Sequence, residues 1–139
     1  MKKSELDLTL LKNSLATLKE CWTDLNIQQD EKIKIYIKDS CIQRFEYTYE
    51  SAKKIMNKFL KKEYDKTEKD LSINNIFREM YSLGLIENFE NWVEYREKRN
   101  ITSHEYNLKL TYTILDCVQN FINDVEFLVD NLEKVLTDD

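Results

Sequence analysis

Apolar residues recur along this chain with the spacing of packed helices. In the first segment the separations alternate strictly between three and four residues. The positions are Leu8, Leu11, Leu15, Leu18, Trp22 and Leu25. This heptad pattern is typical of a helix in a bundle or coiled coil. It predicts a first helix over residues 4–25, followed by a polar loop over residues 26–30.

Two longer segments carry the same rhythm. The earlier one contains Cys41, Phe45, Thr48, Ala52, Ile55 and Phe59, and the later one contains Ile114, Val118, Phe121, Val125, Leu128, Leu132 and Val135. We therefore predict long helices over residues 31–64 and 107–136. Residues 32–38 alternate apolar and polar side chains with a period of two, so an irregular start is the alternative for the earlier helix.

Capping signals predict two short helices between the long ones. Ser72 can accept hydrogen bonds from the free N–H groups that begin a helix over residues 73–83. Gly84 suits the left-handed position that follows such a helix. A charged linker over residues 65–70 precedes this helix. After the helix, Asn88 can cap another one over residues 89–100. The pattern predicts an all-α fold, an antiparallel up-down bundle of five helices, three long and two short, in a single domain over residues 1–139.

The composition supports this fold and narrows the function. The chain has one glycine and no proline, whereas sheet-rich folds need both in tight turns. A net charge of −5 argues against a general nucleic-acid coat but leaves open an enzyme that contacts RNA at one place. Three distant cysteines and one histidine lack the spacing of metal ligands, so we expect no metal and no cofactor. Without a signal peptide or membrane span, the expected location is the cytoplasm.

Charge is distributed unevenly along the chain. Five lysines lie within one stretch of ten residues: Lys53, Lys54, Lys58, Lys61 and Lys62. The C-terminal end is acidic, with Asp116, Asp124, Glu126, Asp130, Glu133, Asp138 and Asp139. The plain interpretation of both groups is a solvated helix face. The alternative for the lysines is a surface for RNA or for a partner protein.

The only histidine lies in a polar segment between the last two predicted helices. Arg99 and His104 are five residues apart, which on one continuous helix puts them about 140° apart around the axis. They would not face the same substrate. A helix break would bring them together, and Thr102 with Glu105 fits a capping box that would supply one. The other solution is a second copy of the chain.

Arginine and histidine together suit a phosphodiester substrate. The guanidinium of Arg99 can bind two phosphate oxygens. The imidazole of His104 can exchange protons with a ribose 2′-hydroxyl or a leaving 5′-oxygen. Asn100 can hydrogen-bond backbone or phosphate. The plainer alternative is a helix-cap histidine beside a surface arginine.

The motif Arg99-Asn100-x-x-x-His104-x-Tyr106 resembles the signature of the HEPN superfamily. Further stretches occur in the order seen in one branch, the nucleotidyltransferase substrate-binding proteins, which include HepT-like toxins. These stretches are residues 42–50, residues 84–86, Trp92 and residues 99–107. The resemblance covers about residues 5–135 and shows no departure from the motif.

The resemblance implies a helical bundle that forms a homodimer, with Arg and His from both subunits in an interfacial cleft. It also implies a minimal nucleotidyltransferase as cognate partner. In toxin members the pair is a metal-independent ribonuclease site, and the partner transfers AMP to the motif tyrosine and silences the toxin. By position Arg99 and His104 would be catalytic, Asn100 would orient them, and Tyr106 would be the AMPylated residue. A non-catalytic substrate-binding subunit and a plain scaffold dimer are the alternatives.

The matching segment 42–50 also has a structural interpretation. Ile42, Phe45 and Tyr49 have helical spacing and are predicted to be core residues. Two possibilities remain for the charged residues between them: they form pairs in solvent, or they line the cleft. Those residues are Arg44, Glu46 and Glu50.

Overall fold

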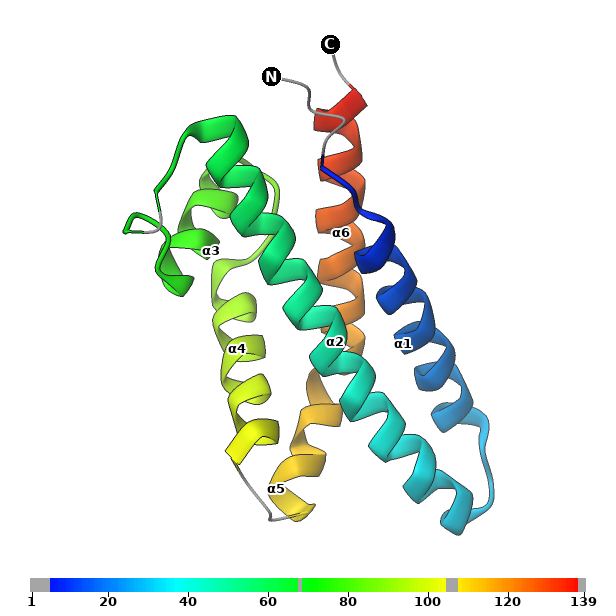
Figure 1. Cartoon of the computed structure of the whole chain (residues 1–139). Coiled ribbons are helices and arrows are strands. Elements are labelled where there is room, and N and C mark those ends of the chain that lie inside the picture. The colour runs from blue at the N-terminus through cyan, green and yellow to red at the C-terminus, as the bar shows by residue number, and fades with distance from the viewer. Residues whose placement is uncertain (1–5, 68, 105–107, 138–139) are drawn as a thin grey trace.

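The computed structural model describes residues 6–67, 69–104 and 108–137, and Figure 1 shows them as a bundle of helices. In chain order the elements are α1 (Thr9–Ile27), α2 (Glu31–Tyr64), α3 (Ile73–Ser82), α4 (Phe89–His104), α5 (Leu108–Tyr112), the 3-10 helix η2 (Thr113–Cys117) and α6 (Val118–Thr137). The described residues contain no strand. The all-α prediction is confirmed.

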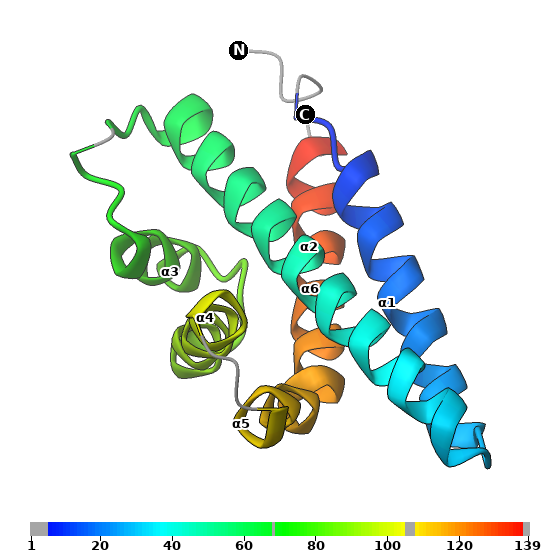
Figure 2. The same ribbon diagram turned by 60° about the horizontal axis from the view of Figure 1, so that its bottom comes forward.

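The long helices α1, α2 and α6 form one side of the bundle, and α1 runs antiparallel to both of its neighbours (Figures 1 and 2). Leu11, Leu15 and Leu18 of the predicted seam are buried between them. The bounds of α2 match the prediction. Its start is regular, because the Asp30 carboxylate accepts hydrogen bonds from the backbone N–H groups of residues 32 and 33 at 2.9 and 3.1 Å.

The first helix begins later than predicted. Residues 6–8 are not helical, and Thr9 is the first residue of α1. The backbone N–H of Thr9 donates to the Asp7 carboxylate at 2.9 Å, a local bond that competes with helix formation. The side chains of Leu6 and Leu8 are buried all the same, so the non-helical segment packs against the core.

Helix α3 ends in the way that Gly84 predicts. This residue has φ +73°, and its N–H donates to the carbonyl of Tyr81 at 3.0 Å. The next N–H, of Leu85, donates to the carbonyl of Met80 at 3.0 Å. The two bonds form a Schellman motif, which needs a left-handed residue at this position. The turn sends the chain back toward the start of α4.

The two predicted capping side chains behave differently. The Asn88 side chain accepts a hydrogen bond from the backbone N–H of Asn91 at 2.9 Å, which confirms it as the cap of α4. Ser72 occupies the cap position of α3, but its hydroxyl accepts no capping hydrogen bond. That part of the prediction is wrong. Ser72 is exposed, so water can satisfy the first N–H groups of α3 instead.

The predicted helix over residues 107–136 is divided. Residue 107 lies outside the described residues, and the rest forms α5, η2 and α6 in succession. The side chains of Thr113 and Cys117 donate to the carbonyls of Leu110 and Ile114 at 2.6 and 3.2 Å. These side-chain bonds compete for the carbonyls that an α-helix would use, which favours the tighter 3-10 winding. The chain therefore changes its winding between α5 and α6.

Aromatic rings join the short helices to the long ones. Phe121 of α6 contacts Phe45, Trp92 and Tyr95, with ring centroids 4.8, 5.9 and 4.9 Å away. Phe77 of α3 packs on Trp92 at 5.8 Å. All five rings are buried. The predicted core residues Ile42, Phe45 and Tyr49 are buried as well.

Two cysteines belong to this core. Cys41 and Cys117 are buried, and burial raises the pKa of each thiol to about 12. Both therefore remain neutral thiols at ordinary pH and act as small apolar side chains, as predicted. None of the described helices combines the length and apolar character needed to cross a bilayer.

Candidate functional site

Arg99 lies on α4 where this helix passes α2, and two glutamates of α2 bind it. Its Nη1 is 3.3 Å from Oε2 of Glu46, and its Nε is 3.2 Å from Oε1 of Glu50. The second contact is an ion pair rather than a well-directed hydrogen bond. The Arg99 side chain is 24% exposed. The glutamates left open by the sequence therefore join the predicted site residue and are not simple solvent pairs.

The packing of α4 determines which way Arg99 faces. Trp92, Tyr95 and Arg99 are spaced by three and four residues, so they share one stripe of the helix. Trp92 and Tyr95 are buried. The stripe directs the first two into the core and brings Arg99 to its edge, against α2.

A buried carboxylate locks this orientation. Asp124 of α6 is 6% exposed and accepts hydrogen bonds from the Tyr95 hydroxyl and, at 3.2 Å, from the side-chain amide of Asn91. Burial and the Asp124 hydrogen bond raise the pKa of Tyr95, so the phenol stays a donor. The prediction of a solvated acidic face is wrong at Asp124. The sequence did contain a sign that Asp124 is buried, because it lies beside Phe121 and Val125 of the apolar row. A charged residue in such a row needs buried partners.

A second tyrosine lies beneath the charged cluster. Tyr49 is 2% exposed, and its hydroxyl has no hydrogen-bond partner among the described residues. Burial raises the pKa of this phenol, and the Glu50 carboxylate adds to the effect while Arg96 and Arg99 oppose it. Tyr49 is therefore a neutral side chain close to the Arg99 cluster.

The remaining predicted site residues extend from Arg99 toward the end of α4. Asn100 is exposed, His104 is the last residue of the helix, and Tyr106 lies outside the described residues, as does Glu105 of the predicted capping box. The backbone is helical through Thr102, so the predicted break between Arg99 and His104 is wrong. Their backbone positions are therefore about 140° apart around one axis. Within one chain the helix does not direct them at a common point.

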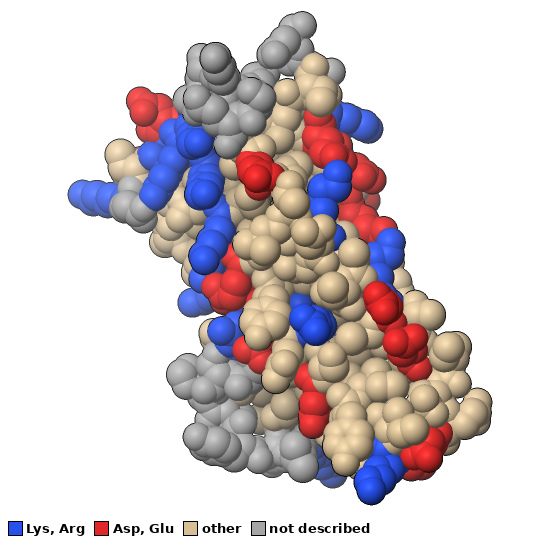
Figure 3. Space-filling model, turned by 45° about the vertical axis from the view of Figure 1, so that its right-hand side comes forward, with Lys and Arg blue, Asp and Glu red and all other residues tan. Residues whose placement is uncertain are grey.

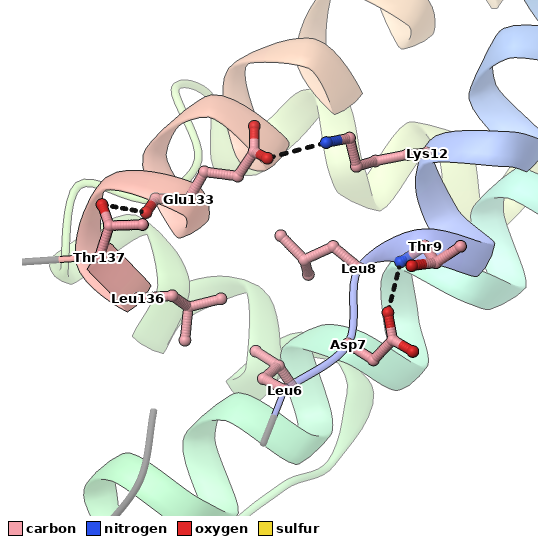
Figure 4. A pocket seen from close by; sticks show the side chains of 8 residues that line it. All are labelled: Leu6, Asp7, Leu8, Thr9, Lys12, Glu133, Leu136 and Thr137. Atoms are coloured by element: carbon pink, nitrogen blue, oxygen red, sulfur yellow. Dashed lines mark hydrogen bonds and ion pairs between the residues drawn. The ribbon is translucent and has the colours of Figure 1, made fainter. Parts of the chain in front are cut away.

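No metal centre adjoins Arg99 in the part of the chain that the structure describes. No group of three or more His, Cys, Asp or Glu side chains suited to a metal ion occurs among those residues. A hollow of about 580 Å³ lies at the other end of the bundle, between the start of α1 and the end of α6 (Figure 4). Lys12 and Glu133 close one side of it with a 2.8 Å ion pair. Its lining comes from residues 6–12 and from the end of α6, so the hollow is not part of the Arg99 site.

The predicted lysine cluster lies on the C-terminal half of α2. Figure 3 shows basic side chains gathered there, while acidic and basic side chains alternate along the opposite edge of this face. On that edge Lys12 and Lys19 of α1 pair with Glu133 and Glu126 of α6 at 2.8 and 2.7 Å. The acidic residues of α6 are thus partly neutralised by α1, and the lysines of α2 stand apart from them.

A family model and a curated protein both match most of this chain. Residues 6–134 match the family model described as nucleotidyltransferase substrate binding protein like. A Haemophilus influenzae protein named probable ribonuclease HepT is 32% identical over 118 residues, which are 81% of this chain and 77% of that protein.

Two solved structures have the same fold. One is HI0074 of Haemophilus influenzae, which is described as having the fold of a substrate binding domain of a nucleotidyltransferase. It superposes with a TM-score of 0.83 at 26% sequence identity. The match covers 91% of this chain and 99% of that chain. A Thermus thermophilus protein gives a TM-score of 0.73 at 25% identity, over 88% and 98% of the two chains.

Proposed function

This chain belongs to the family of nucleotidyltransferase substrate-binding proteins, and from that premise we propose that it is a HepT-like, metal-independent endoribonuclease. We propose further that it works as a toxin whose antitoxin is a minimal nucleotidyltransferase. The name of the Haemophilus relative supports the ribonuclease activity, and the family description supports the partner. One observation carries the proposal: a partly buried arginine is held on the helix that ends at the only histidine.

In the proposed reaction the RNA supplies its own nucleophile. His104 takes the proton from a ribose 2′-hydroxyl, and the 2′-oxygen attacks the adjacent phosphorus. The bond from phosphorus to the 5′-oxygen breaks, and that oxygen takes up a proton from an imidazolium. The products are a 2′,3′-cyclic phosphate and a 5′-hydroxyl. Arg99 binds the phosphate oxygens and stabilises their charge, and Asn100 orients the pair.

The active unit in this proposal is a homodimer. Helix α4 continues through His104, so the backbone positions of Arg99 and His104 in one chain are about 140° apart around its axis. A twofold axis close to the ends of the two α4 helices would bring Arg99 of one chain to His104 of the other. The second copy takes the place of the helix break that the sequence predicted.

Control would act at Tyr106. Transfer of AMP from ATP to its hydroxyl forms a phosphodiester, releases pyrophosphate and adds a bulky anion two residues from His104. The anion would exclude the RNA phosphate by volume and by like charge. Co-expression with the partner should therefore add the mass of one AMP per chain, and Tyr106→Phe should prevent the addition.

The ribonuclease proposal is tested on purified protein in EDTA. Wild-type protein should cleave RNA and leave 2′,3′-cyclic phosphate ends. His104→Ala or Arg99→Ala should reduce the rate by at least about 100-fold, the usual effect of losing an acid–base group or a group that stabilises charge in the transition state. Arg78→Ala is the matched control, since it removes an exposed arginine of α3. Wild-type cleavage no faster than that of His104→Ala would refute the activity.

A non-catalytic substrate-binding subunit is the second candidate. Its support is that Glu46 and Glu50 offset the charge of Arg99 in the single chain. In that role Arg99 would bind a nucleotide phosphate for the partner's reaction. RNA that stays intact with the wild-type protein, together with a partner reaction that fails with Arg99→Ala, would favour this candidate.

A further inference from the structure

The lysines of α2 gather positive charge in one segment of the chain. Residues 53–62 contain five lysines and no acidic residue, although the whole chain has a net charge of −5. Lys53 pairs with Glu50 at 3.3 Å. Lys54 and Lys58 are exposed and have no carboxylate within salt-bridge distance among the described residues. Positive charge is therefore concentrated on one helix of an acidic protein.

Two of these side chains, Lys54 and Lys58, are exposed at the rim of a hollow between α2 and α1, which Asp7, Leu10 and Leu11 also line. Lys54, Lys58 and Lys62 follow one another at intervals of four residues, so they form a stripe with steps of about 6 Å along the axis. The buried stripe of the same helix is on the other side. It consists of Ala52, Ile55, Met56 and Phe59. Evenly spaced ammonium groups of this kind match the repeated phosphates of an extended strand.

Aromatic side chains continue the stripe toward the start of α2. Tyr47 is 57% exposed, and it precedes Lys54 by seven residues, which is two helical turns. Tyr36 is 63% exposed and lies farther along the same side. Exposed aromatic rings beside a basic stripe are the usual means of binding single-stranded nucleic acid, because bases stack on the rings.

The stripe also passes the candidate site. Glu50 contacts both Lys53 of the basic segment and Arg99 of α4, at 3.3 and 3.2 Å. A strand bound along α2 would therefore pass beside the guanidinium proposed to hold the scissile phosphate. An acidic partner protein would also be attracted by the lysines, and the binding test below separates it from RNA.

We propose that the outer face of α2, from Tyr47 to Lys62, binds single-stranded RNA and leads it to Arg99. The lysines bind phosphates, and Tyr47 stacks on a base. The face extends over about 22 Å, and binding depends little on sequence, because every base has a face to stack. The identity of the ligand rests on the proposed ribonuclease function, but binding and cleavage can be measured separately.

Binding is measured with a fluorescein-labelled, 2′-O-methylated oligouridine about 12 nucleotides long, which lacks the nucleophile for cleavage. All proteins carry His104→Ala, and fluorescence anisotropy gives the dissociation constant at several salt concentrations. Lys54→Gln with Lys58→Gln should weaken binding by about tenfold and lower the salt slope by about 1.4, or 0.7 for each lost phosphate contact. Tyr47→Leu should weaken binding, and Tyr47→Phe should not.

The matched control is Arg78→Gln with Lys134→Gln, which removes the same charge from exposed positions on α3 and α6. An affinity of the Lys54 and Lys58 variant equal to that of this control would overturn the proposal. So would an unchanged affinity for RNA combined with lost binding of the nucleotidyltransferase, which would assign the face to a protein partner. Lysine-dependent binding in this assay, combined with no RNA cleavage by the wild-type chain in the separate cleavage assay, would uphold the RNA face and refute the ribonuclease proposal alone.

Discussion

The two glutamates that orient Arg99 also offset its positive charge. Two carboxylates at 3.2 and 3.3 Å hold the guanidinium at the edge of the α2–α4 contact. Such pairs define the direction of an arginine side chain. In the proposed site, an incoming phosphate would have to displace Glu46 and Glu50 or share the guanidinium with them. The glutamates would then set the affinity of the proposed site for anions.

The double variant Glu46→Gln with Glu50→Gln should bind the non-cleavable oligouridine more tightly. Glutamine keeps the size of the side chain but removes two negative charges next to the phosphate site. We expect the dissociation constant to fall by about three- to tenfold at low salt, with the gain lost at high salt because of screening. Fluorescence anisotropy measures the dissociation constant at low and at high salt.

The control for this prediction is Glu126→Gln with Glu133→Gln, which changes the net charge equally on α6. Unfolding should differ little between the two variants, because partly exposed ion pairs contribute at most about 1 kcal/mol. Weaker RNA binding in the Glu46 and Glu50 variant would contradict the prediction. It would mean that positioning Arg99 matters more than its charge.

At the scale of the elements, α4 depends on one cap. The Asn88 side chain accepts from the backbone N–H of Asn91 at 2.9 Å, while the hydroxyl of Ser72, at the same position of α3, makes no such bond. The two residues look equivalent in the sequence. In the structure only Asn88 makes a capping bond, so substituting Asn88 should cost more stability than substituting Ser72.

Asn88→Ala should lower the free energy of unfolding by about 1 kcal/mol, the usual value of a capping bond. Ser72→Ala should change it by less than about 0.5 kcal/mol, as at other surface positions. Urea unfolding followed by circular dichroism gives both values. Equal losses in the two variants would show that the Asn88 bond contributes nothing specific to α4.

Heptad spacing predicted the helices correctly where the local backbone preference and the packing of the apolar side chains both favour an α-helix. It gave the bounds of α2 directly, and it located α1 and α6 to within a few residues or one winding change. It failed between residues 113 and 117, where side chains donate to backbone carbonyls. The capping-box pattern, and not the heptads, predicted the break before His104. It failed because such a pattern shows which bonds are possible and not whether the helix ends there.

At the scale of the whole molecule, the sequence proposed Arg99 as a site residue but did not predict which residues surround it. Glu46 and Glu50 reach it from a helix some fifty residues earlier, and Asp124 fixes α4 through Tyr95 from the other direction. Periodicity assigns each residue to a face, but only packing brings two faces together. The anchors of a site are for this reason harder to predict than the motif that they hold.

The continuous α4 makes the assembly a testable part of the mechanism. Arg99 and His104 of one chain lie about 140° apart around the helix axis. In a twofold dimer each proposed site would take Arg99 from one chain and His104 from the other. A dimer made of one Arg99→Ala chain and one His104→Ala chain would then contain one site with neither group and one with both.

Mixing the two inactive variants should therefore restore RNA cleavage. With random exchange half of the dimers are mixed and one of their two sites is intact, so activity should approach about a quarter of the wild-type rate. The measurement is cleavage in EDTA after the two proteins are unfolded and refolded together. The control is each variant refolded alone, which should remain inactive. A mixture as inactive as its components would show that Arg99 and His104 do not form this site across chains, and the continuous helix would then argue against their acting on one phosphate.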